Sequence, residues 1–229
     1  MLRSLRALEG YQLAGVDHDL GRVDDFLFDD ETWNVRYLVA RTGSWLFGHK
    51  VLILRNELGK PNGATRKIGV TLTQEQIRNA PNLETDAPVS RQQEHLLVSY
   101  IGNTPYWQPL PPPPVGASGS ADVHLRSVRQ VTGYRISAEN GEFGEVADFI
   151  VDDQLWMIRH VVIDTRRWFA GRQVLLAPEW VKGLDWASHT VSLSLTRGQI
   201  EQAPSYDHSA PALRQYEAQT YGSHGSPDR

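Results

Sequence analysis

The chain of 229 residues contains no cysteine. This absence excludes disulfides, thiolate nucleophiles, iron–sulfur clusters and thiolate zinc sites. Long apolar runs are missing as well, since stretches such as residues 96–98 and 160–163 have only the length of a strand. A membrane-spanning helix needs about 20 apolar residues. We therefore expect a soluble, cytoplasmic protein without a transmembrane segment.

The sequence also lacks an excess of positive charge. It has 23 Lys and Arg against 27 Asp and Glu, which gives a formal net charge of −4. Proteins that bind nucleic acid usually have a pI above about 9 and clustered basic residues. Direct binding of nucleic acid is therefore not expected.

A repeat organises what is present. When the sequence is shifted by 123 positions, residues 2–94 match the later part of the chain at 32 of 93 positions without a gap. The N-terminal Leu-Arg-Ser recurs at residues 125–127, in the interior of the chain, so we interpret residues 1–9 as part of a domain and not as a targeting peptide. The repeat predicts two copies of one domain.

The domain boundaries follow from composition. We predict a first copy over residues 1–94, a linker over 95–123, a second copy over 124–217 and a flexible tail over 218–229. The linker holds four consecutive prolines followed by a run of Gly and Ser, which favours a stiff rod with a flexible end. It fits an interdomain tether better than a ligand for a peptide-binding domain, because no basic residue flanks the prolines.

Each copy is predicted to consist of short strands and one short helix. Residues 23–28 and 35–39 form a predicted hairpin, as do 146–151 and 158–163, because they are rich in β-forming residues and flank polar turns. Further strands are expected at 51–54 and 174–176, and at 68–72 and 191–195 with alternating apolar residues. Gly21 and Gly144 precede the first strand of each hairpin, where a turn with positive φ suits glycine.

The helices have recognisable ends. Thr73 with Gln76, and Thr196 with Gln199, have the spacing of a capping box, and Pro81 and Pro204 are expected to end each helix. A unit of about 85 residues with five or six strands is expected to form a small, partly closed barrel. The predicted fold class is all-β, with short helices.

An ordered set of residues, present twice, resembles the PRC-barrel family. In the first copy it comprises Gly21, Asp25-Phe26, Asp29, Trp33, residues 36–39, Trp45, Gly48, Val51-Leu52, Leu72-Thr73, Ile77 and Ala80-Pro81. The family includes the cytoplasmic domain of the photosynthetic reaction-centre H subunit and the C-terminal domain of a ribosome maturation factor. The resemblance implies two tandem PRC-type β-barrels of a bacterial type, each followed by a short helix. It implies protein–protein contact and no shared catalytic residues.

Acidic pairs are the first candidates for chemistry. Asp29-Asp30 and Asp152-Asp153 suit either a metal or acid–base site or a hairpin turn in which the side chains bond local N–H groups. We favour the turn, because both copies need it. Arg36 and Arg159 follow these turns and are expected to pair with carboxylates of their own hairpins: Asp25 or Asp29 in the first copy, Asp148 or Asp152 in the second. We favour this structural role over the alternative, in which the two arginines bind an anion.

The sequence offers little for a cofactor or catalysis. The eight histidines show no HxH or HExxH spacing, and neither a GxSxG elbow nor a glycine-rich phosphate loop is present. We expect no catalytic residues, no bound metal and no cofactor, and hence a protein that is not an enzyme.

Two apolar segments between strands are the candidate partner-binding residues. They are Trp45, Leu46 and Phe47 in the first copy, and Arg166, Arg167, Trp168 and Phe169 in the second. Exposed aromatic residues of this kind favour interfaces, although the same side chains would also plug the end of a barrel. RNA binding by the second segment is disfavoured, because residues 2–83 carry 11 basic against 10 acidic side chains and residues 125–206 carry 9 basic against 10 acidic side chains.

These observations favour a non-catalytic protein-interaction or scaffold module that binds a protein partner or a second copy of itself, with a homodimer as one form. One alternative is an accessory of ribosome or RNA maturation that acts through a ribosomal protein. Another is an accessory of an electron-transfer complex, by analogy with the H subunit.

Overall fold

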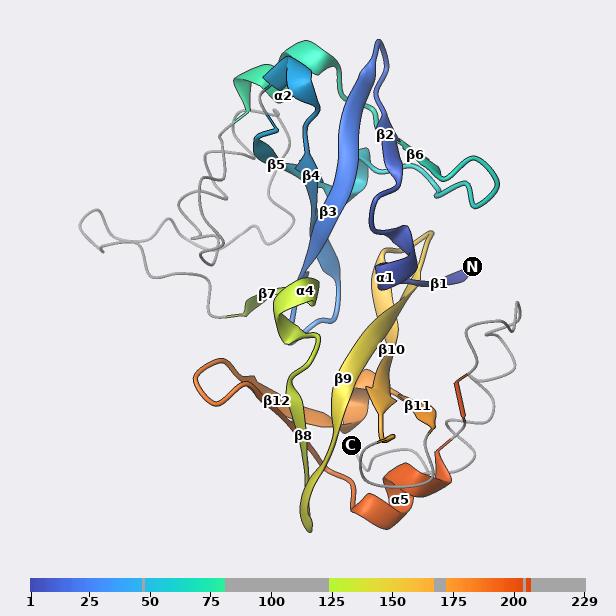
Figure 1. The fold of residues 1–229 in the computed structure, drawn as a ribbon, viewed down its shortest axis with the longest axis vertical. Coiled ribbons are helices and arrows are strands. Elements are labelled where there is room, and N and C mark those ends of the chain that lie inside the picture. Colours follow the sequence, from blue (N-terminus) through green and yellow to red (C-terminus); the bar gives the residue numbers. More distant parts are fainter. Residues whose placement is uncertain (47, 81–123, 167–171, 204, 207–229) are drawn as a thin grey trace, which may run out of the picture. The chain divides into compact units, whose positions relative to one another are not determined.

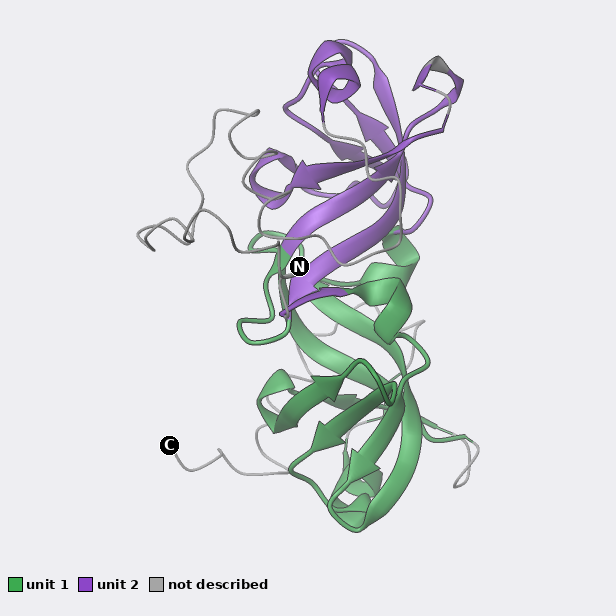
Figure 2. Cartoon of the chain, turned by 90° about the vertical axis from the view of Figure 1, so that its left-hand side faces the viewer, with its two compact units in different colours: residues 1–8, 30–35, 127–229 green, residues 9–29, 36–126 purple. Residues whose placement is uncertain are grey.

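The computed structural model describes residues 1–46, 48–80, 124–166, 172–203 and 205–206 (Figure 1). The chain divides into two compact units (Figure 2). Unit 1 comprises residues 1–8, 30–35 and 127–229, and unit 2 comprises residues 9–29 and 36–126. Each unit therefore takes most of its residues from one copy of the repeat, unit 2 from the first and unit 1 from the second. The predicted boundaries at 94/95, 123/124 and 217/218, and the linker and tail themselves, fall at or within parts outside the described residues and stay predictions.

Unit 2 is built on a mixed sheet with the order β5-β4-β3-β2-β6. In chain order these strands are β2 (Gln12–Ala14), β3 (Asp19–Asp29), β4 (Val35–Arg41), β5 (Lys50–Leu54) and β6 (Lys67–Gly69). The β2–β6 pair is parallel, and the β2–β3 and β4–β5 pairs are antiparallel. Short 3₁₀ helices, η1 (Ser44–Leu46) and η2 (Arg55–Glu57), flank β5, and helix α2 (Gln74–Asn79) follows the last strand.

Unit 1 repeats this plan with the order β11-β10-β9-β8-β13-β12. Its strands are β8 (Arg135–Ala138), β9 (Gly141–Asp152), β10 (Met157–Asp164), β11 (Gln173–Leu176), β12 (Val181–Asp185) and β13 (Thr190–Leu193). The β8–β13 pair is parallel, like its counterpart in unit 2. Short helices α4 (Val128–Val131), η3 (Pro178–Trp180) and α5 (Arg197–Gln202) complete the described elements of this copy.

The N-terminal strands of the two copies are exchanged. Strand β1 (Leu2–Ser4), from the first copy, pairs antiparallel with β9 in the sheet of the second copy, and helix α1 (Leu5–Leu8) contacts the same strand. Its repeat-equivalent, β7 (Leu125–Ser127), pairs with β3 in the sheet of the first copy. Strand β9 has room for both neighbours, because β8 pairs with its first half and β1 with residues 150–152.

The hydrophobic clusters of the two units show the same exchange of N-terminal segments. In unit 2, Tyr37, Val39, Leu52 and Leu54 pack with Leu125. In unit 1, the equivalent cluster of Ala147, Ile150, Val162 and Leu175 packs with Leu2. Leu2 and Leu125 hold the same position in the repeat, so each copy supplies one apolar side chain to the other copy's sheet.

The capping boxes form as predicted. In α2 the Thr73 N–H donates to Gln76 Oε1 (2.8 Å), and Gln76 N–H donates to Thr73 Oγ1 (3.3 Å). In α5 the Thr196 N–H donates to Gln199 Oε1 (2.9 Å). The predicted stops, Pro81 and Pro204, lie outside the described residues, and the helices end at Asn79 and Gln202.

Glycine is required at Gly21 and Gly144, with φ of 140° and 91°. A Cβ on Gly21 would lie 2.3 Å from the Arg41 carbonyl oxygen, and one on Gly144 would lie 2.9 Å from that of Asp164. The predicted positive φ is therefore confirmed at both positions. The two glycines lie inside β3 and β9 and not before them, because these strands start earlier than the apolar pattern indicates.

The predicted fold class is confirmed at the level of a mostly β protein with two mixed sheets and short helices. Both predicted hairpins are present, as β3–β4 and β9–β10.

Candidate functional site

The loop between β4 and β5 carries the first predicted segment, and Thr42 fastens its base. Thr42 is buried; its N–H donates to the His49 carbonyl (2.9 Å), and its hydroxyl donates to the same oxygen (3.0 Å). The hydroxyl also lies 3.3 Å from the Leu46 carbonyl, which it can reach as a second acceptor. These bonds close residues 42–49 into a compact loop around η1.

The loop between β10 and β11 is closed in the same way by Thr165. The Thr165 N–H and hydroxyl both donate to the Arg172 carbonyl, over 3.1 and 2.8 Å. Thr165 is also buried. The ends of the β4–β5 and β10–β11 connections are therefore joined in the same way, each by one threonine.

Arg166 begins the second loop in an ion pair with Asp164. Its Nε lies 2.8 Å from Asp164 Oδ2, and the guanidinium is 64% exposed. The hydrogen bond from Arg166 lowers the pKa of Asp164, and the same bond raises the pKa of Arg166. One face of this guanidinium is thus engaged by the protein while the side chain remains open to solvent.

The predicted partner-binding residues are described only in part. Leu46 is half-buried and Arg166 is exposed. Trp45 lies in η1, while Phe47, Arg167, Trp168 and Phe169 lie outside the described residues. The assignment of these seven residues to partner binding stays a prediction.

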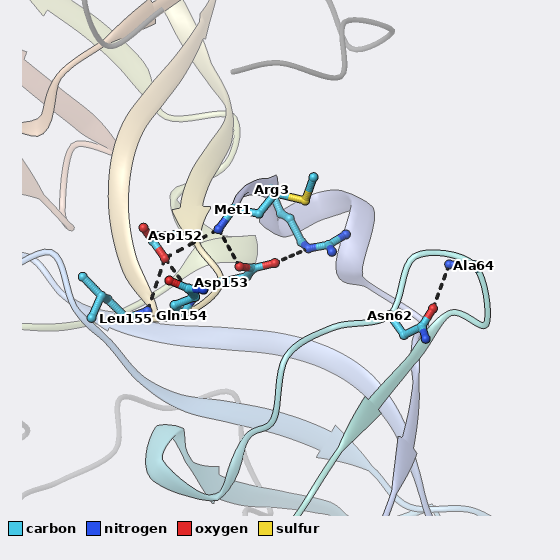
Figure 3. A network of polar contacts seen from close by, with 8 residues as sticks. All are labelled: Met1, Arg3, Asn62, Ala64, Asp152, Asp153, Gln154 and Leu155. Carbon is cyan, nitrogen blue, oxygen red and sulfur yellow. Dashed lines mark hydrogen bonds and ion pairs between the residues drawn. The ribbon is translucent and has the colours of Figure 1, made fainter. Parts of the chain in front are cut away.

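A polar network that the sequence did not indicate lies at the end of β9 (Figure 3). The Asp153 carboxylate is fully buried and accepts bonds from the Met1 amino group (2.8 Å) and Arg3 Nε (2.6 Å). Burial would raise the pKa of Asp153, but the bonds from Met1 and Arg3 outweigh it and lower the pKa. The buried pair anchors β1 to the sheet.

Asp148 lies in β9, five residues before Asp153 in the chain, and binds the same N-terminal segment. Its carboxylate accepts bonds from the Ser4 hydroxyl and from the Arg6 N–H (3.1 Å). It also accepts from the N–H of Phe149 (2.7 Å). Asp148 and Asp153 together recognise the polar side chains of the Leu-Arg-Ser sequence, which the repeat supplies twice.

The acidic turns match the structural interpretation in part. Asp152 Oδ1 accepts bonds from the N–H groups of Gln154 (2.8 Å) and Leu155 (3.3 Å), which is the predicted turn role. Asp153 does not take that role, because its side chain faces the N-terminal segment instead.

Of the two predicted arginine pairs, one forms. Arg36 is buried and pairs with Asp29 (3.3 Å), as expected. The prediction for Arg159 is wrong: within the described residues no carboxylate pairs with its side chain, and its buried Nε, like that of Arg36, has no acceptor. Asp148 and Asp152 instead bond the N-terminal segment and nearby backbone groups.

Arg159 lines a cavity of about 610 Å³ in unit 1. Trp33 lines the same cavity and has a φ of 58°, and its repeat-equivalent Trp156 has a φ of 52°. Left-handed backbone is rare for a bulky residue. It is held here by reciprocal bonds within unit 1, from Val35 N–H to the Trp156 carbonyl and from Ile158 N–H to the Trp33 carbonyl, both 2.8 Å.

Comparison with protein-family models gives no match, and neither does comparison with curated proteins. No group of three or more metal-ligating side chains occurs among the described residues. In the same residues, no helix combines the length and apolar character needed to cross a bilayer.

The strand exchange and the unpaired Arg159 were both missed by the sequence analysis, and only the exchange has a signal in the sequence. The repeated Leu-Arg-Ser sequence indicates that residues 2–4 and 125–127 do the same work, but not which sheet each one joins. Nothing in the sequence distinguishes Arg159 from Arg36, because both follow an Asp-Asp turn at the same spacing.

Proposed function

We propose that this chain is a non-catalytic interaction module built from two PRC-type barrels, each completed by a strand of the other copy. Its partner is another protein or a second copy of the chain. The loops 42–49 and 165–172 serve as the contact surface.

The observation that carries the proposal is the duplicated loop. Thr42 and Thr165 are both buried and fasten loops that contain an aromatic residue at the same repeat position, Trp45 and Trp168. A fixed base lowers the conformational entropy that a loop loses on binding. Tryptophan is among the residues that contribute most to binding at interfaces.

The test is the double variant Trp45→Ala/Trp168→Ala in the full chain. Sedimentation equilibrium reports self-association, and quantitative affinity capture reports protein partners. We expect the variant to lose tenfold or more in the affinity that the wild type shows in either assay, which corresponds to about 1.4 kcal/mol.

Trp186→Ala is the matched control. Trp186 is 41% exposed and lies in the turn between β12 and β13, away from both loops in sequence. It is expected to bind like the wild type. If the double variant binds and self-associates like the control, the loops are not the contact surface.

A further inference from the structure

Arg159 is partly buried, and its Nε is shielded from solvent without a hydrogen-bond partner among the described residues. Leaving a buried donor unsatisfied is unfavourable, and more so in a charged group. A ligand that supplies the missing acceptor removes the unfavourable free energy of the unsatisfied donor.

The repeat shows what Arg159 would otherwise do. The Nε of its equivalent, Arg36, also lacks a partner, but Nη1 of Arg36 pairs with Asp29 in unit 2. The counterpart of Asp29 is Asp152, whose Oδ1 accepts two backbone N–H bonds and lies 4.0 Å from the Met1 amino group. The exchanged N-terminal segment therefore helps to occupy the carboxylate that Arg159 would use.

The register between β9 and β10 shifts at Arg159. Ile158 pairs with Val151 and His160 with Ile150, so Arg159 is the extra residue of a β-bulge. A bulge re-aims one side chain out of the regular alternation, and bulges are frequent beside binding sites. Here the bulged residue lines the cavity of about 610 Å³.

The cavity walls are mixed, with five charged side chains and an apolar part. Met157, Ile158, Pro178 and Val181 lie on the walls together with Trp33. The other lining cation, Lys182, pairs with Glu139 (3.0 Å), and the lining acids Asp30, Glu31 and Glu179 all have partners of their own. Only Arg159 among the charged lining residues is unpaired within the described part of the chain.

We propose that this cavity binds a ligand that carries a single carboxylate on an apolar body, and that the Arg159 guanidinium binds the carboxylate. The planar guanidinium matches a carboxylate in a two-bond arrangement. The three acidic and two basic lining side chains give a formal charge of −1, which disfavours ligands with several negative charges, such as polyphosphates or nucleic acid. None of the lining residues belongs to the loops 42–49 and 165–172, so the proposal does not depend on their function.

Both free organic acids and acidic side chains of a peptide have this chemistry. Isothermal titration calorimetry on the full chain separates them with three probes: phenylacetate, its neutral analogue phenylacetamide, and a capped Phe-Asp-Phe peptide. Binding of phenylacetate assigns the site to free acids. Binding of the peptide alone assigns it to a partner's carboxylate.

The variants are Arg159→Gln and the control Arg135→Gln. Arg135 lies in the same unit, is 54% exposed, pairs with Glu142 (3.1 Å) and does not line the cavity. We expect Arg135→Gln to bind like the wild type and Arg159→Gln to bind at least tenfold more weakly. Arg159→Lys keeps the positive charge but lacks the planar guanidinium that makes two bonds to a carboxylate. Its affinity for the probe is expected to lie between those of the other two variants.

Arg159→Gln should fold normally, since the side chain has no partner to lose, and a circular dichroism spectrum and melting curve check this. The proposal is overturned if Arg159→Gln binds the carboxylate probe as tightly as the control. It is equally overturned if phenylacetamide binds as well as phenylacetate, or if neither carboxylate probe binds the wild type.

Discussion

Single positions in this repeat do different work in the two copies. Arg36 and Arg159 show this for a cation, and Tyr37 and His160 show it for a core position. Both Tyr37 and His160 are buried, but no bond partner meets either ring nitrogen of His160 within the described residues. Burial, and to a smaller extent the charge of Arg159, lowers the pKa of His160 to about 4.

This histidine predicts a pH dependence of stability. In the unfolded chain its pKa is near 6.5, so the unfolded state takes up a proton first as the pH falls. The stability that neutral His160 allows is therefore present above pH 6.5 and decreases towards pH 4. The free energy of unfolding should drop by about 2 kcal/mol between pH 7 and pH 5, as measured by urea unfolding followed by tryptophan fluorescence.

His160→Tyr, which installs the residue of the first copy, should flatten this dependence. The control His18→Tyr changes an exposed histidine, 67% accessible, and should retain it. The titration of Asp153 and Asp164 does not contribute to the change in stability between pH 7 and pH 5. Their pKa values lie below 3.8, so the stability they provide is lost only below that pH. An unchanged slope in His160→Tyr would contradict the assignment.

The residue scale was also the hardest to predict. The Arg36–Asp29 pair follows from spacing across a hairpin, and the capping threonines follow from local rules. The unpaired state of Arg159 does not, because it depends on a segment 150 or more residues away that binds the neighbouring carboxylates. Local sequence patterns carry no information about that competition.

At the scale of elements, the long strands were predictable from the sequence and most of the short ones were not. The central hairpins followed from runs of β-forming residues on either side of polar turns. The three-residue strands β1, β2 and β7 were not predicted, because three residues show no period. Strand β12 was not predicted either, because its five residues Val181–Asp185 do not alternate between apolar and polar. Their pairing is decided by tertiary contacts.

The attachment of β1 predicts the effect of Asp153→Asn. Removing the charge leaves Arg3 and the Met1 amino group without their buried acceptor, so we expect a loss of about 3 kcal/mol in the free energy of unfolding. Hydrogen exchange should show faster exchange in residues 2–4. Asp185→Asn, at an exposed turn where the side chain bonds two N–H groups, should change the free energy of unfolding much less than Asp153→Asn does. Unchanged protection of β1 would contradict the anchoring role.

At the scale of the whole chain, the repeat predicted two like copies but not which residues form each compact unit. Residues 1–8 and 30–35 are encoded in the first copy and belong to unit 1. Identity between the copies conceals such an exchange, because a strand fits its own sheet and the equivalent sheet equally well.

This division predicts that the halves stay together after the chain is cut. A protease site placed between residues 116 and 120 should yield two fragments on a denaturing gel. Size-exclusion chromatography with light scattering should still give the mass of the full chain. The same cut in the Asp153→Asn variant should release part of the material as separate fragments. Separate elution of the wild-type fragments would show that the exchange does not hold them.

The exchanged strands have a consequence for how such a sequence evolves. A deletion that removed the first copy would leave the second half of β9 with bare backbone N–H and C=O groups over residues 150–152, and open edges of this kind promote aggregation. A surviving half would be rescued only by borrowing the strand from another molecule. The duplication is therefore difficult to reverse in one step, and the two halves are inherited together even where their individual residues diverge.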